Sequence, residues 1–348
     1  MWRLETQPVS LHNCTTLVLF SLDGKLGDAI LQSALVRLVH ENHPACKITI
    51  VAAVGLADYW RECHGVSAVH PVSSRSDASS FSRIRELAVI ARIPGVVSAD
   101  LMISFDPIPM VDYFVFIRRC RPRTAISLSA LQYAIFDISI VDPILEIPRE
   151  HVGLRVVRIL ATLGVVVRLE DLRGVIPLRD ARKSHSNDTS LRRRSMVFVN
   201  GFGASATRTF SVEQLDGVVR RLLSASSDLR IVGNVNAAQR GSPRIEQLLA
   251  EFPGRVELLP SNGKIAALFD SITHADAVLT PDTSVGHIAA AQETPAVVVY
   301  DDVGFNPVCW RPLGRNIVQL IPETPGPVSR FSVPILVEAL RAVLKSIE

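Results

Sequence analysis

The chain is poor in the residues that build disulfide-stapled, zinc-bound or nucleic-acid-reading folds. Its five cysteines are widely spread along 348 residues and no two form a C-x-x-C pair. This spacing indicates neither a disulfide framework nor a zinc ribbon. Aromatic residues make up only 6% of the sequence, the net charge is only +3, and no RNA- or DNA-reading motif is present. We therefore expect reduced, buried thiols in a cytosolic protein and no nucleic-acid partner.

Long apolar runs and targeting segments are also lacking. No run of apolar residues approaches the ~18 that span a bilayer. No N-terminal stretch combines a charged region, an apolar region and a small-residue cleavage site. We therefore expect a cytoplasmic chain without a membrane-spanning helix. Hydrophobic residues nevertheless make up 48% of the 348 residues, which indicates two domains with well-filled cores.

The first half of the chain alternates between short apolar runs and apolar stripes at helical spacing. This alternation predicts a parallel sheet with helices on both faces. We assign it to an N-terminal domain, residues 1–177. The predicted strands are 15–20, 47–52, 68–72, 100–104 and 124–128, and the predicted helices are 29–42, 81–92, 110–119 and 151–163.

A polar stretch without apolar periodicity, residues 178–195, is the best candidate for an interdomain linker. A second α/β series follows in residues 196–331, and residues 332–348 form a C-terminal helix. Ser211 to Gln214 is a capping box that opens the first helix of this series. The pattern alone predicts two α/β domains. The predicted strands are 196–200, 229–232, 256–258, 277–280 and 295–300, and the predicted helices are 211–223, 243–251, 265–271 and 285–291.

The most informative segment is residues 280–291, which reads as a strand end, a tight polar turn and a helix of small residues. The N–H groups at a helix start favour an anion, and a phosphate is the usual ligand. His287 lies on the first turn and could donate a hydrogen bond to that anion, or could simply pack on the helix face. The segment therefore predicts a diphosphate site at the carboxyl end of a parallel strand.

Four motifs resemble those of glycosyltransferase family 9, which contains the lipopolysaccharide heptosyltransferases. Along the chain they follow one another in the order found in that family. The first is the pattern D-T-S-x-x-H-x-A-A-A that begins at Asp282, followed by a proline and a valine-rich strand. The second is the L-G-D loop that ends at Asp28. The third is the run 197–205 followed by Arg208, and the fourth is W-R-P after the last predicted strand. Together the matches span residues 15 to about 312.

The resemblance implies a GT-B fold, in which two Rossmann-like domains with parallel sheets face each other across a cleft. It implies an inverting glycosyltransferase that moves a heptose from ADP-heptose to a lipopolysaccharide inner-core acceptor, either Kdo or heptose. The N-terminal domain would bind the acceptor and the C-terminal domain the nucleotide sugar. We expect no cofactor and no metal, because GT-B enzymes do not need a metal and no D-x-D motif lies beside a strand. The resemblance also implies peripheral contact with the cytoplasmic face of the membrane.

The resemblance implies that Asp28, at the end of the L-G-D loop, is the catalytic base. A carboxylate there could otherwise serve only as the N-cap of the following helix. Asp23, one loop position away from the matched site, is interpreted as a turn residue.

On the donor side, Arg208 stands where the family commonly carries a lysine that neutralises the donor phosphates, although a solvated loop arginine is the alternative. Asp282 resembles the family's contact to the donor sugar hydroxyls, and helix capping is its alternative role. Ser205 and Thr207 are candidate hydroxyl donors. The main-chain N–H groups of the turn would bind the diphosphate, and they belong to Thr283, Ser284 and Val285.

One departure concerns the donor nucleotide. The loop 233–239 carries no carboxylate to hold the donor ribose, so Asn234 or Asn236 would have to substitute. The nearest carboxylate pair, Asp301 and Asp302, is interpreted as part of a loop.

A basic cluster in the first domain has two interpretations, a solvated surface or a contact with an anionic acceptor or anionic lipid headgroups. Its members are Arg118, Arg119, Arg121 and Arg123. Other functions also stay open on this fold: a sugar-nucleotide epimerase, a protein glycosyltransferase, or a sugar-nucleotide-binding scaffold without activity. A dinucleotide dehydrogenase is disfavoured because the first loop is not G-x-G-x-x-G.

Overall fold

The computed structural model describes residues 10–74, 78–105, 111–128, 135–140, 150–177, 195–260 and 265–345. The chain divides into two compact units, Met1–Val175 and Ile176–Glu348. Apart from Ser195, the predicted linker lies outside the described residues, and the domain boundaries stay a prediction.

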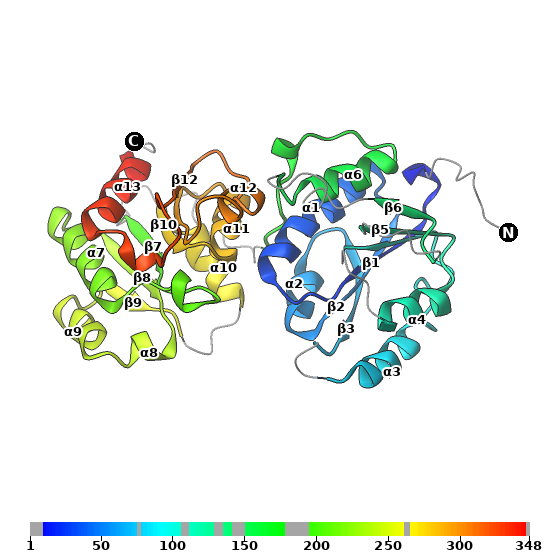
Figure 1. The fold of residues 1–348 in the computed structure, drawn as a ribbon, viewed down its shortest axis with the longest axis horizontal. Coiled ribbons are helices and arrows are strands. Elements are labelled where there is room, and N and C mark those ends of the chain that lie inside the picture. The colour runs from blue at the N-terminus through cyan, green and yellow to red at the C-terminus, as the bar shows by residue number, and fades with distance from the viewer. Residues whose placement is uncertain are drawn as a thin grey trace, which may run out of the picture. The chain divides into compact units, whose positions relative to one another are not determined.

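The first unit contains a six-stranded sheet in which every pair of neighbouring strands is parallel, in the order β3-β2-β1-β4-β5-β6 (Figure 1). Its central strands are rich in valine, isoleucine and leucine because helices cover both faces. The strands are β1 (Thr16–Ser21), β2 (Lys47–Ala53), β3 (Val66–Val72), β4 (Leu101–Ser104), β5 (Thr124–Leu128) and β6 (Ile138–Ile140).

The helices of the first unit lie on the two sides of this sheet. Helices α3 and α4 pack against each other and share an apolar core with β1, β4 and β5. Helices α1 and α6 also contact each other (Figure 1). The helices are α1 (Leu26–Asn42), α2 (Ala57–Glu62), α3 (Ser80–Ile90), α4 (Val111–Cys120) and α6 (Leu154–Thr162).

The second unit repeats this plan with a parallel sheet in the order β12-β11-β10-β7-β8-β9. The strands are β7 (Met196–Asn200), β8 (Arg230–Asn234), β9 (Val256–Leu258), β10 (Ala277–Pro281), β11 (Ala296–Val299) and β12 (Ile317–Leu320). The helices are α7 (Val212–Ala225), α8 (Ala237–Arg240), α9 (Pro243–Glu251), α10 (Ile265–Thr273), α11 (Ser284–Ala291), α12 (Asn306–Cys309) and α13 (Val333–Lys345). Helices α7, α9 and α13 share one core with the sheet.

Both sheets have the Rossmann strand order. Each therefore has a switch point, where successive strands stop being added on one side of the first strand and start being added on the other. The switch point lies between β1 and β4 in the first unit and between β7 and β10 in the second. Ligands of such sheets bind beyond the carboxyl ends of the strands at this place. We therefore expect ligand-binding residues in the loops after β1, β7 and β10.

The structure also tests two expectations from the sequence, that the cysteines are buried thiols and that no helix spans a membrane. All five cysteines are buried and none forms a disulfide. Within the described ranges, no helix is both long and apolar enough to cross a membrane.

Candidate active site

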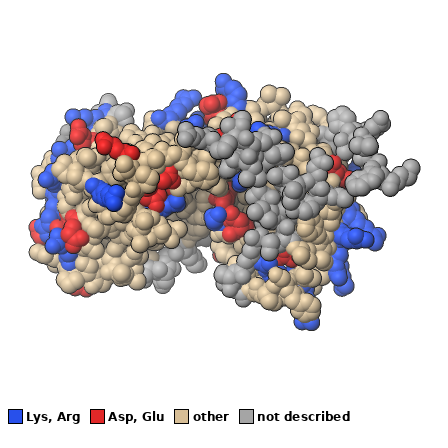
Figure 2. Space-filling view, viewed as in Figure 1, with Lys and Arg blue, Asp and Glu red and all other residues tan. Residues whose placement is uncertain are grey.

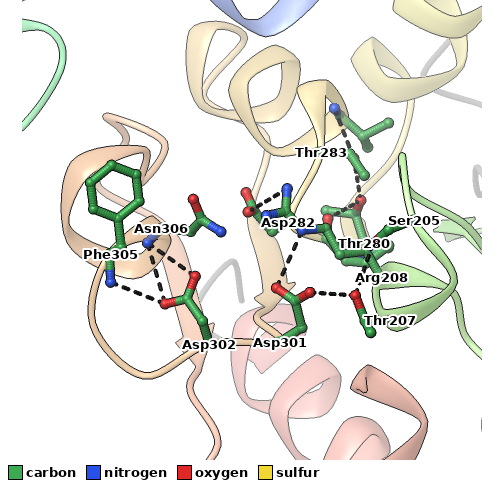
Figure 3. A network of polar contacts seen from close by, with 12 residues as sticks. Ser205, Thr207, Arg208, Thr280, Asp282, Thr283, Asp301, Asp302, Phe305 and Asn306 are labelled. Atoms are coloured by element: carbon green, nitrogen blue, oxygen red, sulfur yellow. Dashed lines mark hydrogen bonds and ion pairs between the residues drawn. The ribbon is translucent and has the colours of Figure 1, made fainter. Parts of the chain in front are cut away.

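In the second unit, polar side chains gather where the neighbouring strands β7, β10 and β11 end. The loop after β7 carries a short 3₁₀ helix, Ala206–Arg208, while α11 starts directly after β10 and Asp301 follows β11 closely. Figure 3 shows that side chains from these three loops point toward one another. Five predicted donor-binding residues are among them: Ser205, Thr207, Arg208, Asp282 and Thr283.

Helix α11 begins directly after β10, as predicted, but its N-cap is Thr283. The Thr283 hydroxyl accepts a hydrogen bond of 3.2 Å from the main-chain N–H of Val285. The interpretation of Asp282 as the helix cap is therefore wrong, and the N–H of Val285 already has a partner within the turn. The N–H groups of Thr283 and Ser284 precede the first intrahelical bonds, so this end of α11 stays suited to an anion.

Small residues let α11 pack closely on its surroundings. A Cβ atom on Gly286 would lie 2.9 Å from Cγ of Pro312 and 3.1 Å from Cγ2 of Val298. Since Pro312 belongs to the W-R-P motif, that motif supports the first turn of α11. His287 lies in the same turn and is buried. Its hydrogen bond to a phosphate stays a prediction.

Arg208 lies between two carboxylates. Its Nη1 atom is 3.2 Å from Oδ2 of Asp282, and its Nε atom is 3.2 Å from Oδ1 of Asp301. The interpretation of Arg208 as a solvated loop residue is therefore wrong. A guanidinium group carries five N–H donors, more than these two contacts use, so it can bind an anionic ligand without leaving either carboxylate.

Asp301 joins the loop after β7 to the end of β11. Its Oδ2 atom accepts a hydrogen bond of 2.6 Å from the Thr207 hydroxyl, which lies 2.8 Å from Oγ of Ser205. Asp301 is thus a member of the site. Its interpretation from the sequence as a plain loop residue did not include this role. Asp302 has a different role, because its carboxylate accepts hydrogen bonds from the N–H groups of residues 304–306 and holds the turn into α12 (Figure 3).

The pKa of the Asp282 carboxyl is raised to about 6. Burial is the largest cause, the Arg208 guanidinium opposes it, and the charges of Asp301 and Asp302 reinforce it. The carboxyl is therefore mostly ionised at neutral pH and becomes neutral in mildly acidic solution. Its ion pair with Arg208 weakens as it is protonated.

In the first unit, Asp28 lies beyond the carboxyl end of β1 in the first turn of α1, which begins at Leu26 rather than at residue 29 as predicted. Gly24 has a φ of 77° and makes the left-handed turn that leads into the helix. The N-cap residue is Lys25, so the interpretation of Asp28 as a helix cap is wrong. The Asp28 carboxyl is buried at the switch point of the first sheet.

Three charged side chains act on the Asp28 carboxyl. The Nζ atom of Lys25 lies 3.8 Å from Oδ2 of Asp28 and 3.5 Å from Oδ2 of Asp23. The pKa of Asp28 is raised to about 8, first by burial and then by a hydrogen bond to Asp23 and the charge of that residue, while Lys25 and Arg155 oppose the shift. A carboxyl with such a pKa is a stronger base than an ordinary aspartate, and a pKa near the working pH suits a general base.

The predicted basic cluster lies at the end of α4 and just beyond it. All four arginines of the cluster, residues 118, 119, 121 and 123, are exposed. The cluster belongs to the first unit, whereas the loops after β7 and β10 belong to the second.

Comparison with known protein families gives one match. The family model described as glycosyltransferase family 9 (heptosyltransferase) matches residues 148–330, just over half of the chain. The protein belongs to glycosyltransferase family 9. The matched region contains all the donor-side residues discussed above, whereas Asp28 lies outside it. A search of curated proteins gave no significant match.

Solved structures of two heptosyltransferases and of a family 9 glycosyltransferase share the fold of this glycosyltransferase. The Escherichia coli ADP-heptose lipopolysaccharide heptosyltransferase II is 15% identical, with a TM-score of 0.72 over 95% of this chain and 99% of that chain. A family 9 glycosyltransferase from Veillonella parvula DSM 2008 is 13% identical, with a TM-score of 0.76 over 97% and 99%. The E. coli heptosyltransferase WaaC with ADP is 17% identical, with a TM-score of 0.70 over 94% and 99%. The predicted GT-B type fold is thereby confirmed.

The sequence did not reveal one buried residue that organises this glycosyltransferase site. Asn200 ends β7, and its Nδ2 atom donates hydrogen bonds of 2.9 Å to the carbonyl of Phe202 and 3.1 Å to Oγ1 of Thr280. Its Oδ1 atom accepts a hydrogen bond of 2.8 Å from Asn234. Asn200 therefore fixes the ends of three strands against one another. The sequence signal that could have indicated this role is a polar residue, Asn200, at the end of an otherwise apolar strand.

The two asparagines predicted as ribose ligands both serve the fold of the glycosyltransferase. Asn234 is bound to Asn200, and Asn236 is the N-cap of α8, where its side chain accepts a hydrogen bond of 2.9 Å from the N–H of Gln239. In the part of the chain that the structure describes, no cluster of three metal-ligating side chains is present.

Proposed function

We propose that this glycosyltransferase transfers a heptose from ADP-heptose to a lipopolysaccharide inner-core acceptor, with inversion at the anomeric carbon. The observation that carries the proposal is the position of Arg208, which two carboxylates hold beside the start of α11 in a chain of family 9. A cation and a helix N-terminus at a Rossmann switch point together suit a nucleoside diphosphate.

The leaving group of the proposed reaction is a diphosphate, whose negative charge grows as the bond to the sugar breaks. Arg208 and the N–H groups of Thr283 and Ser284 would stabilise this charge. Because Asp282 and Asp301 hold the guanidinium in place before the ligand arrives, little reorganisation is needed during the reaction. Asp282 also offers a carboxylate oxygen to the sugar hydroxyls, the role that the family resemblance implies.

The acceptor hydroxyl needs a base. In the proposed step, an acceptor oxygen forms a bond to the anomeric carbon and gives its proton to a carboxylate oxygen of Asp28. The bond between the anomeric carbon and the phosphate oxygen breaks, and its electron pair leaves with the nucleoside diphosphate. The raised pKa of Asp28 supports this role, because a stronger base lowers the barrier to proton transfer.

The choice of ADP rests on relatives, since the E. coli heptosyltransferase WaaC is described with ADP. The competing donors are UDP sugars, which a sugar-nucleotide epimerase on this fold would use. A panel of nucleoside diphosphates separates the two, because a ligand that binds only the folded state raises Tm by mass action. We expect ADP to raise Tm more than UDP, GDP or CDP at equal concentration.

A second variant tests where the nucleotide binds. Ser284→Trp places a large side chain at the first residue of α11, and we expect it to abolish the rise in Tm with ADP. Ser224→Trp, at an exposed position of α7, is the matched control and should keep it. A normal ADP response in Ser284→Trp would place the nucleotide elsewhere. Equal responses to all four nucleotides would remove the assignment of ADP.

The proposed acceptor is a lipid, and the outer face of α3 and α4 has the chemistry to contact an anionic membrane surface. Phe81, Val89 and Val111 on these helices are 63%, 65% and 68% exposed. The guanidinium of Arg85 lies 4.5 Å from the centre of the Phe81 ring, and the exposed arginines 118 and 119 lie in the last turn of α4. Figure 2 shows basic side chains gathered over this edge of the first unit. Exposed apolar groups among arginines are typical of surfaces that bind anionic lipids.

A vesicle flotation assay tests this contact. We expect the protein to float with vesicles that contain anionic phospholipid and not with neutral vesicles. The variant Arg118→Glu/Arg119→Glu should lose most of the binding, since each basic residue near such a surface contributes about 1 kcal/mol. Arg341→Glu/Lys345→Glu on α13 makes the same change of charge at exposed positions and should bind normally. Equal loss in both variants would show that net charge alone drives binding.

A further inference from the structure

The loop after β1 holds a second carboxyl group beside the proposed base. The Nζ atom of Lys25 lies within 4 Å of the carboxyl groups of both Asp23 and Asp28, at 3.5 Å and 3.8 Å. Hydrogen bonding to Asp23 and the charge of that residue both raise the pKa of Asp28. The main-chain N–H of Lys25 also donates a hydrogen bond of 2.7 Å to Oδ1 of Asp23. The carboxyl groups of Asp23 and Asp28 thus both lie beside the ammonium group of Lys25, at the switch point of the first sheet.

We propose that Asp23 and Asp28 form a pair that shares one proton, and that Asp23 is the positioning residue that makes Asp28 a strong base. The proposal deepens the proposed function, since it rests on Asp28 as the base of the transfer reaction. The pairing of the two carboxyl groups can be tested without any substrate.

The geometry decides which carboxyl group carries the proton. The Asp28 side chain is only 9% exposed, whereas that of Asp23 is 36% exposed and receives both the Lys25 N–H and the shorter contact to Nζ. A negative charge is more stable at the better solvated and better bonded position. The proton therefore belongs on Asp28, whose O–H donates to the Asp23 carboxylate.

The two carboxylates repel each other once Asp28 ionises, and this repulsion increases the affinity of Asp28 for a proton. In the reaction, ionised Asp28 takes the proton of the acceptor hydroxyl, and the new O–H group is again bound by Asp23. Product formation thus restores the hydrogen bond that ionisation had removed. Lys25 and Arg155 are the positive groups that act on Asp28, and they limit the effect.

The alternative is that Asp23 only shapes the turn by binding the N–H of Lys25. Asp23→Asn distinguishes the two roles, because an asparagine oxygen can still accept that hydrogen bond while the negative charge is removed. If Asp23 acts only on the turn, this conservative variant should leave the titration of Asp28 unchanged.

The experiment is a pH titration of the full-length protein labelled with ¹³C at aspartate carboxyl groups, with the Asp28 signal assigned by its loss in Asp28→Asn. We expect Asp28 in the wild type to titrate far above an ordinary aspartate, with a midpoint near 8. In Asp23→Asn the midpoint should fall by about 1 pH unit or more, the size of effect that a nearby like charge produces. In Lys25→Met, which keeps both carboxyl groups and loses the cation, it should rise.

Thermal stability gives an independent readout of the same pair. Because the pKa of Asp28 is higher in the folded state than the ~4 of an unfolded chain, folding takes up a proton between these two values. The free energy of unfolding therefore falls as pH rises from about 4 to about 8. Asp23→Asn should make this fall smaller, provided the variant keeps the wild-type Tm near pH 4.

An unchanged Asp28 midpoint in Asp23→Asn would overturn the pair, and so would a fall rather than a rise in Lys25→Met. If the midpoints shift as expected but ADP-heptose gives no product, the pair stands and the proposed function fails. If transfer is observed, the acid limb of the kcat/KM profile should move to lower pH in Asp23→Asn by the same interval as the midpoint.

Discussion

Asp28→Asn should lower the rate of heptose transfer at least ~10²-fold while leaving ADP binding unchanged, because a positioned base contributes about that much. Asparagine keeps the size of the side chain but accepts no proton at neutral pH. The residues proposed to bind ADP lie in the other unit of the chain, so the rise in Tm with ADP should match that of the wild type. Single-turnover transfer and the ADP thermal shift, measured on the same preparation, check both halves of the expectation.

The variant should also be at least as stable as the wild type at pH 8. The burial that raises the pKa of Asp28 makes its ionised form costly in the folded state, and asparagine avoids that cost. A loss of activity would then have no origin in unfolding. Asp58→Asn, at an exposed carboxylate on α2 that pairs with Arg61, is the matched control and should transfer normally. Transfer within a few fold of the wild type in Asp28→Asn would remove the base assignment.

Much of the fold could be predicted because its signals are local. Strand β7 and helix α9 have the bounds that the sequence predicted, since an apolar run between polar residues limits the first and a serine cap followed by proline opens the second. The capping box at Ser211 and Gln214 is present in both of its bonds. In such patterns, a few neighbouring residues determine where the helix or strand begins and ends.

The elements that were missed have weaker patterns. Strands β6 and β12 are short, lie at sheet edges and are only partly buried, so their residues do not form a distinct apolar run. Helices α2 and α8 are six and four residues long, too short to show a helical stripe. Their existence depends on the strands they connect rather than on their own residues.

The membership of the site was harder to predict than its location. The motif at 282–291 and the strand order together predict a diphosphate site at the start of α11. The role of Asp301 depends on a contact across 93 residues of sequence, to Nε of Arg208. The pairing of Asp23 with Asp28 depends on the exact path of a loop that contains Gly24. Pairwise contacts of this kind leave no periodic signal in one sequence.

Arg208→Ala should reduce turnover ~10²–10³-fold and weaken ADP binding much less. In the proposed reaction Arg208 faces charge that develops in the transition state, and removing one preorganised donor to such charge has an effect of that size. The variant also leaves Asp282 and Asp301 without their shared cation, so the pKa of Asp282 should rise further. Turnover under saturating donor, set against the Kd for ADP, separates the two effects.

Arg208→Lys should recover only part of the loss. An ammonium group supplies the charge that family members place here, but it lacks the planar fork that binds Asp282 through Nη1 and Asp301 through Nε at once. Arg221→Ala, at an exposed position of α7, removes the same charge away from the site and is the control. If Arg208→Lys were fully active, charge alone would suffice and the two carboxylates would have no part in positioning it. If Arg208→Ala itself were fully active, the leaving diphosphate would have to be stabilised by α11 and by another cation.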